Sequence, residues 1–326
     1  MSSSNTTVTE APGELAPRRR VLHGLTWLVV RQHRAALYCM LGVTALCSLW
    51  ILYERHELVQ LIDAAGGPDE VTGDPIGTSR GYDFISSIFS LLPLVFAVLI
   101  GAPLIAGDQE NGTAQLVTTQ SVTRRRWLIA KLALAYSLAL ASGALLSFFF
   151  TWWWEPHRSL FSSKWMENVI FDNTGPVLPA YLLFVTAAAI TIGVLVRRVL
   201  PAMVATFLFT MIAGSAWNML REHLAPSRMF AYPLHSDLPA RFSEIHELDR
   251  WIGSADGRLY GWGSCAEETE AAQNACIKDK GIVNDVIEYL DYNQMAAMQW
   301  TGAGILLAGT VLLTAVTLWR GSRRPL

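Results

Sequence analysis

Six long stretches of the chain are almost purely apolar, and the polar residues gather in the segments between them. A helix needs about 20 mostly apolar residues to cross the hydrocarbon core of a bilayer, and each stretch is long enough. The pattern predicts an all-α integral membrane protein with six transmembrane helices, named spans one to six in chain order. The spans are Ala35–Tyr53, Phe84–Ala106, Trp127–Trp154, Val177–Val196, Val199–Leu220 and Ala297–Trp319.

Composition supports this prediction. Hydrophobic residues make up 52 % and charged residues 16 % of the 326, whereas soluble domains carry about 25 % charged residues. Lys131 is the only charged side chain within the spans, and it is expected to snorkel to the nearby membrane interface. The chain up to Pro17 is rich in Ser, Thr, Pro and Glu, so residues 1–19 are expected to form a disordered cytosolic tail.

The basic residues predict the orientation of the spans, because Lys and Arg are enriched in short loops on the cytoplasmic side. If the N-terminus lies inside, 14 of the 25 Lys and Arg residues flank the inner ends of the spans. We therefore expect both termini in the cytosol of a multi-pass protein of the cytoplasmic membrane. The inner basic residues are Arg18, Arg19, Arg20, Arg31, Arg34, Arg124, Arg125, Arg126, Lys131, Arg197, Arg198, Arg320, Arg323 and Arg324.

Residues 35–220 hold spans one to five, and the segment between spans five and six, residues 221–296, is too long to be a simple turn. It is expected to form an extracytoplasmic subdomain. Residues 297–326 then hold span six and a cytosolic tail. Two parts of the subdomain have apolar residues at the spacing of an amphipathic helix, so we predict that the subdomain is partly helical. The apolar positions are Phe242, Ile245, Leu248 and Ile252, and then Ile282, Val283, Val286, Ile287 and Leu290.

The four cysteines fall into two groups. Cys39 and Cys47 lie in span one and are expected to be small apolar core residues. Cys265 and Cys276 lie in the subdomain, where an oxidising exterior would join them in a disulfide. Free thiols, or a metal site with the three nearby histidines, are the alternatives, although the spacing matches no metal signature. These histidines are His223, His235 and His246.

Several kinds of chemistry lack a sequence signature here. The chain has no phosphate-binding G-x-x-x-x-G-K-[ST] loop, no G-x-S-x-G nucleophile motif and no basic stripe with interleaved aromatics for nucleic acid. No catalytic residue or metal ligand is predicted. The spans also lack the Asp, Glu or central Lys and Arg that ion-coupled carriers use. Pro93 and Pro103 are expected to bend span two. Small residues four apart permit close helix packing at Ala139/Gly143, Ala189/Gly193 and Gly304/Ala308.

The inner segment between spans two and three, residues 107–126, combines a charged entry, a Gly turn and Thr residues before three successive Arg residues. This segment resembles the ABC-2 family of transporter permeases, and residues 119–124 are especially similar to its actinobacterial members. Many members have Pro where this chain has Gln120 and Ser121. The family positions are occupied by Glu110, Gly112, Thr113, Leu116, Thr119, Thr123, Arg124 and Lys131.

The resemblance implies a function and partners. Such a permease uses a separate ABC ATPase subunit, which binds ATP and Mg, and no cofactor is expected in this chain. A second permease copy and membrane lipid would complete the assembly. Residues 107–126 would form a short coupling helix against the ATPase, with Glu110, Thr113, Arg124 and Arg125 as contacts. An amphipathic interfacial helix before span one is implied at residues 20–34.

Three hypotheses about function follow. The first is the permease subunit of an ATP-driven exporter for an apolar or amphipathic compound, such as a drug, antibiotic, lipid or hydrophobic peptide, because no Lys or Arg ring lines the spans. The second is a non-transporting membrane scaffold or sensor whose extracytoplasmic subdomain binds a ligand or partner. The third, an intramembrane enzyme, is disfavoured because the spans contain no paired ionisable groups.

Overall fold

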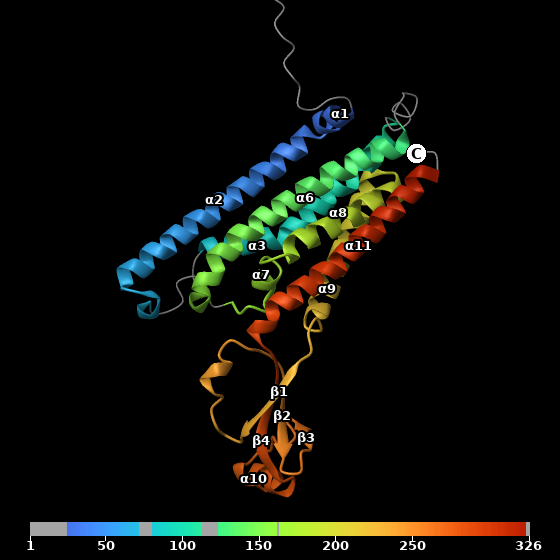
Figure 1. Cartoon of the computed structure of the whole chain (residues 1–326). Helices are drawn as coiled ribbons and strands as arrows, with labels where there is room; N and C mark the ends of the chain where they lie inside the picture. Colours follow the sequence, from blue (N-terminus) through green and yellow to red (C-terminus); the bar gives the residue numbers. More distant parts are fainter. Residues whose placement is uncertain (1–24, 72–79, 113–122, 162, 324–326) are drawn as a thin grey trace, which may run out of the picture.

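The computed structural model describes residues 25–71, 80–112, 123–161 and 163–323. Six of its helical segments are long and apolar enough to cross a membrane, which confirms the predicted number. The long helices run between two ends of the molecule, and a small sheet domain extends from one of them (Figure 1). We call this end the sheet end. The opposite end, where α1 and the last turn of α11 lie, is called the basic end because Arg124–Arg126, Arg197 and Arg198 lie there.

The helices are longer than the apolar stretches that predicted them. Span one continues to Ala65 and span two to Glu110, because polar residues prolong a helix beyond the apolar part that hydropathy detects. The helices are α1 (Leu25–Gln32), α2 (Arg34–Ala65), α3 (Arg80–Val95), α4 (Ala102–Glu110), α6 (Arg124–Trp154), α7 (Asn168–Phe171), α8 (Val177–Val196), α9 (Val199–Arg221), α10 (Glu270–Asp279) and α11 (Met295–Arg323).

Helix α8 is the centre of the bundle and contacts α3, α4, α6, α9 and α11. Small residues let neighbouring backbones approach closely. A Cβ added to Gly193 would lie 2.7 Å from the backbone oxygen of Ala102, and one added to Gly143 would lie 2.7 Å from Cα of Pro179. These two glycines therefore serve packing within the chain. A Cβ added to Gly304 would meet no atom of the described residues within 4 Å.

Span two is interrupted between its two prolines. Pro93 lies inside α3, Pro103 lies at the start of α4, and a π-helical turn, Phe96–Gly101, separates them. Proline has no backbone N–H and cannot donate an i→i−4 hydrogen bond. The two prolines bracket the turn in which the helix changes to wider i→i+5 bonding.

The prediction of an all-α protein is wrong for the sheet domain. Residues 228–290 form a four-stranded antiparallel sheet with strand order β1-β4-β2-β3, and α10 connects β3 to β4. Both amphipathic helices expected there are mainly strands. The strands are β1 (Arg228–Pro233), β2 (His246–Ser254), β3 (Leu259–Gly261) and β4 (Ile282–Leu290).

The apolar spacing of residues 282–290 predicted a helix and not a strand because of the position of β4 in the sheet. It is a central strand, and three successive residues, Asp285, Val286 and Ile287, are buried. A strand covered on both faces has no alternation of apolar and polar residues, so its pattern resembles that of a buried helix. In the first part, Phe242 ends a short 3₁₀ turn and Ile252 lies in β2.

Candidate functional site

Two charged side chains meet inside the basic end of the bundle. Asp108, in the last turn of α4, forms an ion pair with Lys131 of α6. Lys131 is fully buried and also donates a 2.6 Å hydrogen bond to the backbone oxygen of Leu104. The ammonium lies 5.0 Å from the ring centroid of Trp127. Asp108 thus neutralises the charge of Lys131, and both hydrogen-bond acceptors of the ammonium lie within the chain.

The expectation that Lys131 snorkels to the interface is therefore wrong. The statement that the spans lack acidic residues also fails, because the helix of span two includes Asp108 beyond the predicted end at Ala106. A charge within the bilayer is costly unless it is paired. The sequence signal was available: a Lys inside a span requires a partner, and Asp108 is the carboxylate two residues beyond the predicted end of the preceding span.

Helix α1 joins the same site. The Gln32 side-chain amide donates a 2.6 Å hydrogen bond to Asp108 Oδ1. Helix α1 occupies the described part of the interfacial helix expected at residues 20–34, and residues 1–24 lie outside the described chain. One carboxylate therefore connects α1, α4 and α6 at the basic end.

Glu110, the last residue of α4, follows Asp108 by two positions and makes a different contact. Its Oε2 accepts a 2.7 Å hydrogen bond from the backbone N of Val199. Val199 is the first residue of α9, where N–H groups lack helical partners and the helix dipole favours a negative charge. Glu110 thus caps α9 across the tight turn of Arg197 and Arg198.

The two ends of the predicted coupling segment are anchored in the bundle. Near its start, Gly112 has φ +70°, a left-handed conformation that suits glycine. Near its end, the Thr123 hydroxyl accepts a 3.4 Å hydrogen bond from the backbone N of Arg126 and caps α6. Arg124 is half-buried and Arg125 is exposed. The segment is therefore attached to α4 on one side and to α6 on the other.

Three residues of the predicted site fall between the described ranges 80–112 and 123–161. Thr113, Leu116 and Thr119 lie outside the described residues, as does the proposed coupling helix around them. Glu110, Gly112, Thr123, Arg124 and Lys131 are described.

A second set of polar contacts attaches the sheet domain to the spans. Arg158 follows α6 and binds the Glu244 carboxylate with both Nε, at 2.9 Å, and Nη2, at 3.1 Å. The Trp165 indole donates a 2.8 Å hydrogen bond to the backbone oxygen of Glu244. The guanidinium of Arg158 also lies 4.4 Å from the ring centroid of Tyr292. Glu244 is therefore a polar contact between the domain and the sheet end of the bundle.

A carboxylate at the sheet end, Asp172, has an unusual environment. It accepts a 2.7 Å hydrogen bond from the Trp217 indole and a 3.5 Å one from Arg221. Burial raises the pKa of Asp172 from 3.8 to about 6. The positive charge of Arg221 and the Trp217 hydrogen bond lower the pKa but do not cancel the effect of burial.

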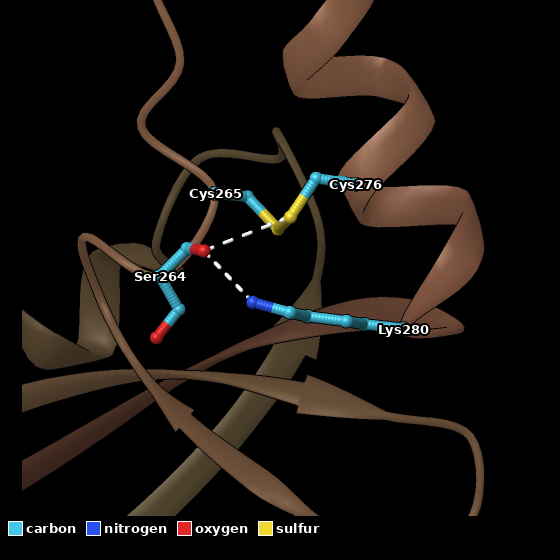
Figure 2. The surroundings of a disulfide bond; sticks show 4 residues. All are labelled: Ser264, Cys265, Cys276 and Lys280. Carbon is cyan, nitrogen blue, oxygen red and sulfur yellow. Dashed lines mark hydrogen bonds between the residues drawn. A yellow bond between two sulfur atoms is a disulfide. The ribbon is translucent and has the colours of Figure 1, made fainter.

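Cys265 and Cys276 are joined in a disulfide between the loop after β3 and α10 (Figure 2). Lys280 donates a 2.8 Å hydrogen bond to the backbone oxygen of the adjacent Ser264. Of the other two cysteines, Cys47 is buried in the core as expected, but the expectation is wrong for Cys39, which is exposed on α2. No group of three or more His, Cys, Asp or Glu side chains that could hold a metal occurs in the described part of the chain.

Six apolar helices, of which the first begins and the last ends at the basic end, define a multi-pass membrane protein. A family model described as ABC-2 membrane transporter related matches residues 41–221, more than half of the chain. The chain therefore belongs to the ABC-2 family of transporter permeases, which are membrane transport components without their own ATPase. Searches of curated proteins and of solved structures found no match.

Proposed function

We propose that this chain is the membrane-spanning subunit of an ATP-driven exporter and that its ATPase docks on the basic end. The observation that carries the proposal, beyond the family, is the anchoring of the coupling segment. Asp108 and Lys131 link its flanking helices, α4 and α6, and Glu110 links it to α9. A force on the segment would reach three spans through buried or capping contacts.

The proposed orientation puts the basic end in the cytosol and the sheet domain outside the cytoplasmic membrane. The exposed basic side chains at that end, among them Arg125, Arg126 and Arg198, support this orientation because Lys and Arg favour cytoplasmic loops. The disulfide of the sheet domain also favours an oxidising exterior.

A second copy of the chain is proposed as the partner within the membrane. Helix α9 supports this because it buries few of its side chains within the chain: Ala202, Thr206, Thr210, Trp217 and Arg221. Its exposed residues include Leu200, Leu208 and Ile212, which suit lipid or a second permease. The cargo proposed for this assembly is apolar or amphipathic, because the buried cations of the described helices, Lys131 and Arg221, are already paired with Asp108 and Asp172.

Copurification tests the proposed function. Tagged wild-type protein, solubilised from native membranes, should bring down an ATPase and ATP hydrolysis. Glu110→Lys should lose that ATPase, because the substitution places a positive charge beside the N-terminus of α9 and the Arg-rich turn. Glu267→Lys is the matched control, since it reverses an exposed charge in the sheet domain. A folded wild type that brings down no ATPase would refute the proposal.

The scaffold or sensor hypothesis retains one supporting observation. The sheet domain has its own apolar core, including Tyr232, Phe242 and Ile287, and its own disulfide. This alternative predicts that charge reversal at Glu110 leaves function unchanged, whereas loss of the sheet domain abolishes it. The copurification experiment with the two reversals distinguishes the hypotheses.

A further inference from the structure

A cavity of about 350 Å³ lies where the sheet domain meets the outer turns of the bundle. One wall comes from the end of α6 and the residues that follow it, and the other from the loop before β2. Small-molecule sites in proteins have volumes of about 300–1,000 Å³. The cavity is thus large enough for a small ligand or part of a larger one.

Four aromatic side chains line the cavity, beside Ile245 and several polar residues. Trp154, Phe161 and Trp165 line the cavity and are each at least nine-tenths buried. Trp165 is fixed by its hydrogen bond to the Glu244 backbone, and Tyr292 is covered by the Arg158 guanidinium. Preformed aromatic walls favour an apolar or aromatic ligand body and cost little ordering on binding.

The charges at the cavity are unbalanced. Arg158 is neutralised by Glu244 through two hydrogen bonds. Lys164 is exposed, and the ion pairs found among the described residues do not include it. The nearby Glu167 carboxylate accepts from the backbone N of Lys164, at 2.9 Å, and does not line the cavity. The lining groups therefore carry a net positive charge supplied by Lys164.

A neighbouring cavity provides the contrast. The Trp154–Tyr292 pair, with ring centroids 6.2 Å apart, also lines a cavity of about 220 Å³. That cavity includes Glu155 and has no Lys or Arg in its lining. The positive charge is therefore specific to the first of two adjoining cavities that share the same aromatic pair.

We infer that the cavity between the sheet domain and the spans binds an anionic amphiphile, with its apolar body against the aromatic walls and its acidic group near Lys164. The chemistry fits a carboxylate or phosphate attached to an acyl or aromatic body, whether from a lipid or a free compound. Binding at this site requires neither the ATPase nor transport, so it does not depend on the proposed function.

Photolabelling of the full-length protein in nanodiscs tests the inference. The probes are a diazirine-bearing medium-chain fatty acid and the primary alcohol and primary amine with the same chain. Peptide mass spectrometry should locate the fatty-acid label around Trp154–Trp165 and Tyr292, in excess of the label from the other two probes. Lys164→Glu should reduce this label about tenfold, because a charge-assisted contact is replaced by repulsion.

Lys278→Glu, an exposed reversal on α10, is the matched control and should leave the label unchanged. Label on the exposed face of α9 should not change in either variant. Equal labelling by acid, alcohol and amine, or unchanged labelling in Lys164→Glu, would overturn the inference. Nanodiscs with and without phosphatidylglycerol identify the source: suppression by this lipid indicates a lipid headgroup as the occupant, and unchanged labelling indicates a free amphiphile.

Discussion

Asp108 and Lys131 form a buried ion pair although 23 positions, including most of the predicted coupling segment, separate them in the sequence. A buried pair is costly to form, but removal of one partner is costlier because it leaves an isolated buried charge. The pair thus fixes the distance between α4 and α6 at the point where the segment leaves the bundle.

Single and double substitutions test this role. Lys131→Met or Asp108→Leu alone should reduce the free energy of unfolding by about 3–5 kcal/mol. The double variant should recover most of the loss, because two apolar side chains fill the site without a charge. Thermal unfolding in detergent, followed by tryptophan fluorescence, gives the comparison, with Lys278→Met as the surface control. A double variant that is less stable than either single one would contradict this account.

Glu110 is expected to contribute to stability through its cap on α9. Glu110→Ala removes an acceptor from the first turn of that helix and should cost about 0.5–2 kcal/mol. Glu110→Gln keeps an oxygen acceptor but loses the charge that favours the helix N-terminus, so its loss should be smaller. Melting temperatures of the two variants in the same detergent measure the difference. Equal melting temperatures for Glu110→Ala and wild type would show that the cap is not important for stability.

The same substitution should lower stability at one glycine and leave it unchanged at another. Gly193→Leu drives a side chain into the backbone of α4, where the added Cβ alone lies 2.7 Å from an oxygen. Overpacking usually costs about 1–3 kcal/mol, and contact with backbone makes relief harder. The added Cβ of Gly304→Leu would meet no atom of the described residues within 4 Å, so this variant should keep the stability of the wild type. Size-exclusion profiles and melting temperatures compare the variants, and a well-folded Gly193→Leu protein would disprove the close packing of α4 and α8.

Asp172 should make stability depend on pH. Its pKa in the folded protein is about 6, above the ordinary 3.8, so the folded state binds a proton more readily than the unfolded state. The resulting stabilisation is complete below about pH 4 and is lost as the pH rises through 6. A difference of about two pKa units corresponds to about 3 kcal/mol.

The Asp172→Asn variant lacks this titration. Its melting temperature relative to wild type should therefore rise between pH 4 and pH 8, which thermal unfolding at several pH values can measure. Asp279→Asn, at the end of α10, is the control and should follow wild type. A difference between wild type and Asp172→Asn that does not change with pH would rule out the shifted pKa.

The spans were predictable because a single property, the length of apolar runs, determines them. Spans four and five begin where predicted, at Val177 and Val199. The role of Lys131 was not predicted, since hydropathy records a charge without its partner and the helix of span two extends past the apolar run. Glu110 was selected by its position in a motif. Its contact with Val199 depends on how α4 packs on α9, which the motif does not specify.

The sheet domain shows a different limit. A helix and a strand covered on both faces give similar apolar runs, so periodicity alone could not separate them. Two local signals favoured strands. The β4 segment is rich in β-branched residues such as Ile282 and Val286. The pair Asp256 and Gly257, with φ +84° at the glycine, lies between β2 and β3 and is typical of a hairpin turn.

Strand β4 is the last strand in the chain, yet it lies between β1 and β2. Synthesis proceeds from the N-terminus, so β1 and β2 are made without the strand that they share. Until residues 282–290 follow, both strands present unpaired edges that can pair with other chains. Helix α11 begins a few residues after β4. Completion of the sheet and insertion of the final span are therefore adjoining steps in the biogenesis of this protein, and a chain shortened before β4 would lose both.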